Sequence, residues 1–544
     1  MASLNSVLDI AKTALLANQK AINVTSHNIS NANTEGYTRQ KAVLEPMNSV
    51  RNGGLYFGTG VDVTSIERVY DRFQSVQIRT AASALGRYET KGEHLTGLEA
   101  LVNDMDGAGL SSKITDFFNS FQDLGNDPSS YSERSALLSN ASLLTDAFNT
   151  IDATIRLNLE SINKELESAV QEINITASQI ADLNHGISSI EASGMKANDL
   201  RDKRDLLLEN LSSMVDISTM EGDTGQIDVY IGGFFLVTGV NTAPLELDIN
   251  PENQVYDIVS NGTVLNSRIT GGSIKGHIEG SQIYTDAQDK LNLLAVSITK
   301  EVNIQHQAGY GLDGSTGVDF FASPSVYTQA GTNNTGGAVI SGGTVTDLNL
   351  LTLDDYEVRF SGAANYTVVN TDTNAVVTSG AYTSGGSITF EGLSFTVTST
   401  AGAPAAGDKF TVSSRKNAAE NIGLSITDPN KIAAAATLAG TPGDNTNAMA
   451  LADLKDSLAV DGATFSEYYN GLVSDVGFDT SEASGNYAAN TRLLEQLKAS
   501  RESVSGVSIE EEAINLIKLQ RAYEAAAKIM TTADQMLETI INII

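Results

Sequence analysis

The sequence predicts a multidomain α+β protein in which the terminal helices pair as a coiled coil, a long-helix rod forms the body, and β-rich outer domains are inserted. Three observations predict this class: apolar residues recur at helical spacing at both ends, a third helical stripe extends from Leu137 to Ile190 with a stutter around Ile162, and period-two alternation is confined to central segments. The 544 residues are enough for about three or four domains.

Both ends of the chain carry an apolar stripe whose spacing alternates between four and three residues. This spacing is typical of a coiled coil, and an amphipathic helix of about 30 residues gains most of its stability by packing such a stripe on a partner. We therefore expect the two termini to pair with each other; the alternative is that each docks separately on the middle of the chain. The expected interface residues are Leu4, Leu8, Leu15, Ile22, Ile29, Ile509, Leu516, Tyr523, Met530, Leu537 and Ile541.

A polar segment, "NISNANTEGYTR", follows the first helix from Asn28 to Arg39. Asparagine side chains compete with helical backbone hydrogen bonds, and Gly36 allows the chain to turn, so the segment predicts a helix stop. Tyr37 and Arg39 stand at its end. We expect these two side chains to be free to contact a neighbouring subunit.

The middle of the chain alternates between helical and β-type patterns. Asn261-Gly262 separates two β-prone runs, which predicts a hairpin, and short strand-like runs follow one another from Tyr356 to Ser414, as in a sandwich or barrel. The expected domains are an inner domain of residues 1–60 and 505–544, a helical body of residues 61–225, 280–325 and 445–504, a β-rich insert of residues 226–279, an outer β domain of residues 335–415, and a linker of residues 416–444.

Motifs for catalysis or cofactor binding are weak. The chain has no cysteine, and its five histidines are scattered without paired metal-ligand spacing. Residues 309–314 match GxGxxG, but a helical pattern precedes them where a nucleotide site needs a strand, so a turn is the better interpretation. We expect no catalytic residues, no cofactor and no metal. The net charge of −32 disfavours nucleic acid and anionic membranes as partners.

Both termini resemble one protein family. "SLNSVLDIAKTALLANQKAINVTSHNISNANTEGYTRQ" is similar to the N-terminal signature of bacterial flagellar axial proteins, which comprise rod, hook and hook-associated proteins. "SGVSIEEEAINLIKLQRAYEAAAKIMTTADQMLETIINI" resembles the matching C-terminal element. Three segments resemble the body of the hook-associated branch: "GQIDVYIGGFFLVTG", "NLLAVSITKEVNIQHQAGYGLDGSTGVDFF" and "NTRLLEQLKASRESVSGVSIEEE".

The resemblance implies a non-catalytic structural component of the bacterial flagellum that connects hook to filament. It further implies self-assembly into a ring, with the hook protein below and a second junction protein above. An export chaperone would bind the C-terminal helix before secretion by the flagellar type III route, and the mature protein would be extracellular, at the distal end of the hook. The alternatives are another axial protein, such as a hook or distal rod subunit, a secreted adhesin, and an axial protein fused to a wall hydrolase.

Overall fold

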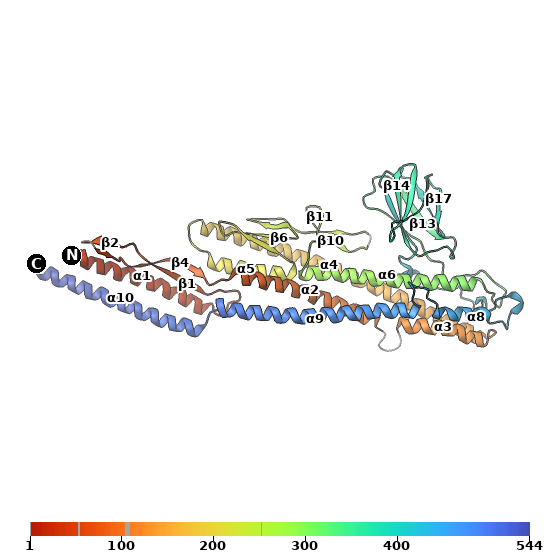
Figure 1. Cartoon of the computed structure of the whole chain (residues 1–544), viewed down its shortest axis with the longest axis horizontal. Coiled ribbons are helices and arrows are strands. Elements are labelled where there is room, and N and C mark those ends of the chain that lie inside the picture. The colour runs from red at the N-terminus through yellow and green to blue at the C-terminus, as the bar shows by residue number, and fades with distance from the viewer. Residues whose placement is uncertain (1, 53–54, 104–108, 252, 544) are drawn as a thin grey trace.

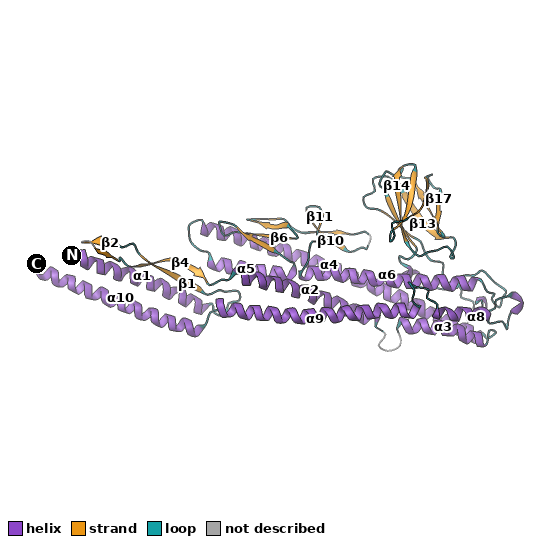
Figure 2. Ribbon diagram, in the orientation of Figure 1, coloured by secondary structure: helices purple, strands orange, loops and turns teal. Residues whose placement is uncertain are grey.

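The chain forms an elongated rod with both termini at one end (Figure 1). The computed structural model describes residues 2–52, 55–103, 109–251 and 253–543. Strands gather on one side of the helical rod (Figure 2), as two β-rich units and a ribbon beside the terminal helices. The multidomain α+β prediction is confirmed. Within the described ranges, no helix is both long enough and apolar enough to cross a membrane.

The inner domain is built from the two ends of the chain. Helix α1 (Ala2–Ser30) packs antiparallel along α10 (Ile509–Ile543), as expected from their stripes. A β ribbon lies against α1. It consists of β1 (Gln40–Pro46) paired with β4 (Val61–Arg68). This ribbon crosses residue 60, so its second strand lies beyond the expected domain boundary. A second, shorter pair joins β2 (Val50–Asn52) to β3 (Leu55–Phe57).

The helical body is assembled from both halves of the chain. Its longest helix, α4 (Tyr131–Glu191), contains the predicted pattern and begins at Ser130, whose side chain accepts a hydrogen bond from the Glu133 amide. The other body helices are α2 (Arg72–Val102), α3 (Leu110–Asn126), α5 (Asn198–Met214), α6 (Gly272–Gln307), α8 (Thr446–Asp453) and α9 (Phe465–Ser505). At one end of the rod, buried aromatic side chains join α3, the segment after α6 and the start of α9: Phe117, Phe118, Phe121, Phe320, Phe321 and Phe465.

The β-rich insert consists of two small antiparallel sheets. One has the order β5-β6-β7-β8, with bounds Ser218–Glu221, Ile227–Ile231, Phe234–Thr238 and Asn241–Thr242. The other has the order β11-β10-β9, with bounds Thr263–Val264, Tyr256–Ser260 and Glu246–Ile249. The predicted hairpin is present: Asn261 and Gly262 have φ of 49° and 75°, the left-handed values that a two-residue turn requires. The insert begins before residue 226, and α6 already starts inside its expected range.

The outer β domain packs two antiparallel sheets around an aromatic core. The larger sheet has the order β12-β19-β14-β15-β16, with bounds Tyr327–Ala330, Lys409–Ser413, Asp355–Gly362, Asn365–Asn370 and Val376–Ala381. The smaller has the order β13-β18-β17, with bounds Val339–Val345, Leu393–Thr398 and Ser387–Phe390. Because β12 joins the larger sheet, the domain starts before the expected residue 335. It projects sideways from the rod (Figure 1).

Residues 416–444, expected as a linker, are packed into the helical body instead. They contain the short helix α7 (Ala418–Asn421) and the buried side chains of Ile426 and Ile432. The guanidinium of Arg134, itself 1% exposed, donates to the Ile432 carbonyl at 2.7 Å. Helices α4 and α6 cover the apolar residues of this segment. The prediction of a linker is therefore wrong. Residues 309–314 form a turn, as predicted, with the Gly314 amide bonded to Gly311.

Candidate functional site

The polar segment after α1 forms a joint between the inner domain and the body, and Asn28 is its centre. Asn28 is 1% exposed. Its Oδ1 accepts hydrogen bonds from the Gln40 amide (3.0 Å) and the Tyr37 hydroxyl (2.8 Å). Its Nδ2 donates to the Gln40 carbonyl (2.9 Å) and to Oε2 of Glu512 on α10 (3.2 Å). The four bonds use the two acceptor and two donor positions of the amide.

The start of α10 is fixed to the joint by Glu512, whose side chain is 3% exposed. Nε of Arg39 donates to Oε1 of Glu512 at 2.8 Å, and the Arg39 backbone amide donates to the Ser505 carbonyl at 2.9 Å. A buried carboxylate is stable only when paired and hydrogen-bonded, and Arg39 and Asn28 meet that need from both sides. The end of the first helix is thereby tied to the beginning of the last.

The joint is fixed to the body through α5. The Thr38 amide and hydroxyl donate to the Asp202 carboxylate at 3.0 and 2.6 Å, and Nη1 of Arg68 bridges Asp202 and Asp205 at 2.6 and 2.8 Å. Burial raises the pKa of Asp202, opposed by its hydrogen bonds to Thr38 and by the Arg68 charge. These contacts hold the β ribbon, the loop and α5 in one arrangement.

Tyr37 and Arg39 are therefore engaged within their own chain, whereas the sequence suggested that they were free for a neighbour. Burial raises the pKa of the Tyr37 phenol, and the carboxylates of Asp199, Asp202 and Glu512 raise it further, so the phenol stays protonated. The hydroxyl lies 3.1 Å from Nδ1 of His27. A neighbour that used either side chain would compete with these bonds.

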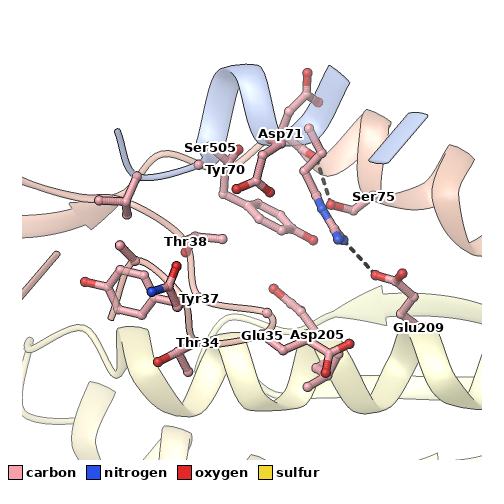
Figure 3. A pocket seen from close by; sticks show the side chains of 18 of the residues that line it. Thr34, Glu35, Tyr37, Thr38, Tyr70, Asp71, Ser75, Asp205, Glu209 and Ser505 are labelled. Carbon is pink, nitrogen blue, oxygen red and sulfur yellow. Dashed lines mark hydrogen bonds and ion pairs between the residues drawn. The ribbon is translucent and has the colours of Figure 1, made fainter. Parts of the chain in front are cut away.

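A cavity of about 300 Å³ lies beside the joint (Figure 3). Several of its polar groups already have structural partners. Asp71 caps α2 by accepting from the Phe73 and Gln74 amides at 2.9 and 3.2 Å. Glu209 on α5 binds Lys498 and Arg501 on α9 at 2.8 and 2.7 Å. Asp71 therefore stabilises the start of α2, and Glu209 joins α5 to α9. The polar groups of the cavity serve the packing of the joint.

The inner helices meet along small side chains. Ala11, Ala17 and Ala21 of α1 and Ala526 and Ala533 of α10 are buried, at 2–7% exposure. Small residues permit close helix approach. The buried line on α1 then passes through Val24 and Thr25 to Asn28, one position before the expected Ile29.

The expected interface residues therefore lie at the edges of this contact or outside it. In α1 all five are half-buried, and in α10 Leu516, Met530 and Leu537 are half-buried while Ile509, Tyr523 and Ile541 are exposed. Further large apolar side chains are exposed on the two helices, at 37–56%: Val7, Ile10, Leu16, Ile514, Ile517, Ile529, Met536 and Ile540. The helix pair thus leaves apolar surface uncovered.

The short ribbon of β2 and β3 adds a second exposed apolar group. Val50, Leu55, Tyr56 and Phe57 are 50–71% exposed. Together with the exposed side chains of α1 and α10, they give the inner domain much of its exposed large apolar surface.

Comparison with known proteins identifies the family of this chain. Over 99% of its length the chain is 32% identical to "Flagellar hook-associated protein 1" of Escherichia coli strain K12, and covers 100% of that relative. It is 31% identical to the protein of the same name from Bacillus subtilis strain 168, over 98% of this chain and 97% of the relative. The chain belongs to the flagellar hook-associated protein 1 family. It is a structural protein of the flagellum.

The domain families match this assignment. Residues 95–321 match "Flagellar hook-associated protein FlgK helical domain" and residues 329–414 match "Flagellar hook-associated protein 1, D2-like domain". Residues 8–38 match "Flagella basal body rod protein" and residues 498–543 match "Flagellar basal body rod FlgEFG protein C-terminal". The joint lies where these two terminal matches meet. A hook-associated protein 1 therefore shares its inner domain with rod proteins.

A solved relative has the same fold. The flagellar hook junction protein FlgK from Burkholderia pseudomallei aligns with a TM-score of 0.67 at 23% identity, covering 79% of this chain and 100% of the other. Asn28, Glu512 and Asp202, which build the joint in this hook-associated protein, were not singled out from sequence. The only signal was a polar residue, Asn28, placed directly before the apolar stripe position Ile29.

Proposed function

We propose that this protein is a subunit of the hook–filament junction, where copies assemble into a ring through their terminal helix pairs. The observation that carries the proposal is the exposed apolar surface of α1 and α10, which their mutual packing leaves uncovered. In a ring, each helix pair buries this surface against the next. The joint gives the pair a fixed direction relative to the body, which a repeating assembly needs.

The family and the exposed apolar surface support a proposal for the partners. The hook protein would contact the ring from below and a second junction protein from above, with the exposed ribbon of β2 and β3 as an additional apolar contact. Before secretion, an export chaperone would cover the C-terminal helix, whose exposed Ile517, Ile529 and Ile541 would otherwise associate without order. The protein would then be extracellular, at the distal end of the hook.

The first experiment tests the interface by genetics. A strain lacking its own copy receives the double variant Leu516→Asp, Leu537→Asp, which puts charges into a half-buried apolar stripe. We expect loss of filaments and motility, with the protein still made and the body folded. The matched control, Thr531→Asp with Gln535→Asp, changes exposed polar positions of the same helix and should assemble normally. Normal filament growth in the first variant would refute the interface.

The second experiment tests the location. Gold-labelled antibody against the outer β domain should give one spot at the boundary between hook and filament. Labelling along the whole hook would indicate a hook subunit, labelling at the hook base a distal rod subunit, and labelling over the cell surface an adhesin. Each of these three results would replace the proposal.

A further inference from the structure

Three side chains from separate body helices meet at one point. His94 is on α2, Glu165 on α4 and His277 on α6. Nε2 of His94 lies 3.0 Å from Nδ1 of His277. Oε2 of Glu165 lies 3.8 Å from the first nitrogen and 3.4 Å from the second. Their three ligand atoms therefore form a nearly regular triangle.

The size of this triangle fits a transition-metal ion. Tetrahedral Zn²⁺ with bonds of about 2.05 Å places neighbouring ligand atoms about 3.3 Å apart, which falls within the observed range of separations. The centre of the circle through the three atoms lies about 2.0 Å from each, so an ion slightly out of their plane would have bonds of about 2.1 Å, the length of a Zn–N or Zn–O bond. A cation could bind with little movement of the side chains.

The protonation states also suit a metal. Burial lowers the pKa of His94 to about 4. Burial and the neighbouring His94 lower the pKa of His277 to about 4 as well. Both imidazoles are therefore neutral near pH 7, which is the form that binds cations, and each side chain is 11% exposed. The carboxylate of Glu165 supplies negative charge.

The fold holds the histidines in place through a glycine. A Cβ at position 280 would lie 2.3 Å from Cδ2 of His94, so only glycine lets the imidazole pack against the α6 backbone. Thr90 of α2 packs against α6 in the same way, 2.6 Å from where a Cβ of Gly276 would be. This close approach of α2 to α6 brings His94 within reach of His277. Packing against the α6 backbone therefore fixes the position of the His94 ring.

A hollow gives access to the three ligand atoms. It has a volume of about 680 Å³ and is also lined by Glu93, Glu172 and Tyr284. The pKa of Tyr284 is raised to about 12 by burial and by the charge of Glu165, which keeps the phenol protonated and able to donate. Water from this hollow can supply the fourth ligand of a tetrahedral ion.

We propose that His94, Glu165 and His277 form a binding site for one divalent transition-metal cation, with Zn²⁺ as the ion that best fits two imidazoles and a carboxylate. Nitrogen ligands disfavour Ca²⁺ and Mg²⁺, which prefer oxygen. The bound ion would join α2, α4 and α6 across the rod. Such a clip stabilises the folded body, because the three ligands come together only there.

The test uses the full-length chain after removal of metals with a chelator. Addition of Co²⁺ should give the visible absorption of a tetrahedral complex and saturate at one ion per chain, and Zn²⁺ should displace it. The variant His94→Gln, His277→Gln should bind more than about 100-fold more weakly. Glu165→Gln, at a half-exposed position that folding tolerates, should also weaken binding. The control His185→Gln changes an exposed histidine of α4 and should bind as the parent does.

A second readout is thermal unfolding. Excess Zn²⁺ should raise the melting temperature of the parent and of His185→Gln but not that of His94→Gln, His277→Gln, because a ligand bound only to the folded state stabilises it. The proposal is overturned if the parent takes up no Co²⁺ in tetrahedral form. It is equally overturned if Glu165→Gln and the double histidine variant, both shown to be folded by circular dichroism, bind as tightly as the parent.

Discussion

Replacement of Asn28 by alanine should loosen the joint between the inner domain and the body. The substitution removes all four hydrogen bonds of the buried amide. Glu512 keeps Arg39, and Tyr37 keeps His27, so the groups left without a partner are the amide and carbonyl of Gln40. Each buried polar group that loses its hydrogen bond costs about 1–3 kcal/mol. For the two groups together we therefore expect local destabilisation of about 2–6 kcal/mol.

Hydrogen exchange of the native protein measures this loss where it occurs. A chain with several domains does not unfold in one step, so a global free energy of unfolding would mix the joint with other regions. At about 1.4 kcal/mol per factor of ten, exchange in the peptide that contains Gln40 should accelerate by about 30-fold to about 20,000-fold. Exchange in α4 should be unchanged.

The matched control is Asn31→Ala. Asn31 lies in the same polar segment, and its amide donates to the His27 carbonyl at 3.0 Å in an exposed position, so its loss should cost little. If Asn28→Ala accelerated exchange near Gln40 by no more than Asn31→Ala does, the four bonds would not hold the joint and the reasoning would be refuted.

Three further predictions concern the body and the turn. Phe117→Ala should lower the free energy of unfolding of the body by about 3–5 kcal/mol in urea titrations, because it empties a fully buried site. Burial lowers the pKa of His306, whose Nε2 accepts a hydrogen bond from the Ala433 amide. Below about pH 6.5 the unfolded chain therefore binds more protons at this residue than the folded chain does. The free energy of unfolding should fall between about pH 7 and pH 5, and more steeply in the parent than in His306→Gln. Gly36→Ala should destabilise the joint by about 1 kcal/mol in hydrogen exchange, because φ is +76°, whereas Gly58→Ala, in open space, should have no effect.

The long helices and the β units could be predicted because their signals are local. The stripe from Leu137 to Ile190 lies within α4, and Asn261-Gly262 forms the hairpin turn. Local spacing could not show which side of α1 and α10 forms the contact between the two helices. The heptad spacing favours Leu15, Ile22 and Ile29, but alanines let the helices approach more closely along a neighbouring line.

The joint and the histidine cluster could not be predicted from sequence for a different reason. Glu512 is one of three acidic residues in the first turn of α10, and nothing near it in sequence indicates that Asn28 is its partner. His94, Glu165 and His277 likewise come from three helices and have no characteristic spacing. Contacts of this kind depend on how helices pack, which a periodicity does not specify. The expected linker failed for the same reason, since its apolar residues meet α4 and α6 only in the fold.

The bond between Asn28 and Glu512 joins residues from opposite ends of the chain, and this has a consequence for folding order. Helix α1 is synthesised first but cannot pack until α10 has been synthesised, because its contacts are mainly with α10 and with the ribbon of β1 and β4. Contacts between distant residues form late, after the local helices. A chain truncated anywhere before Glu512 lacks both the partner helix and the carboxylate that holds Arg39. The inner domain can therefore form only after α10 has been synthesised.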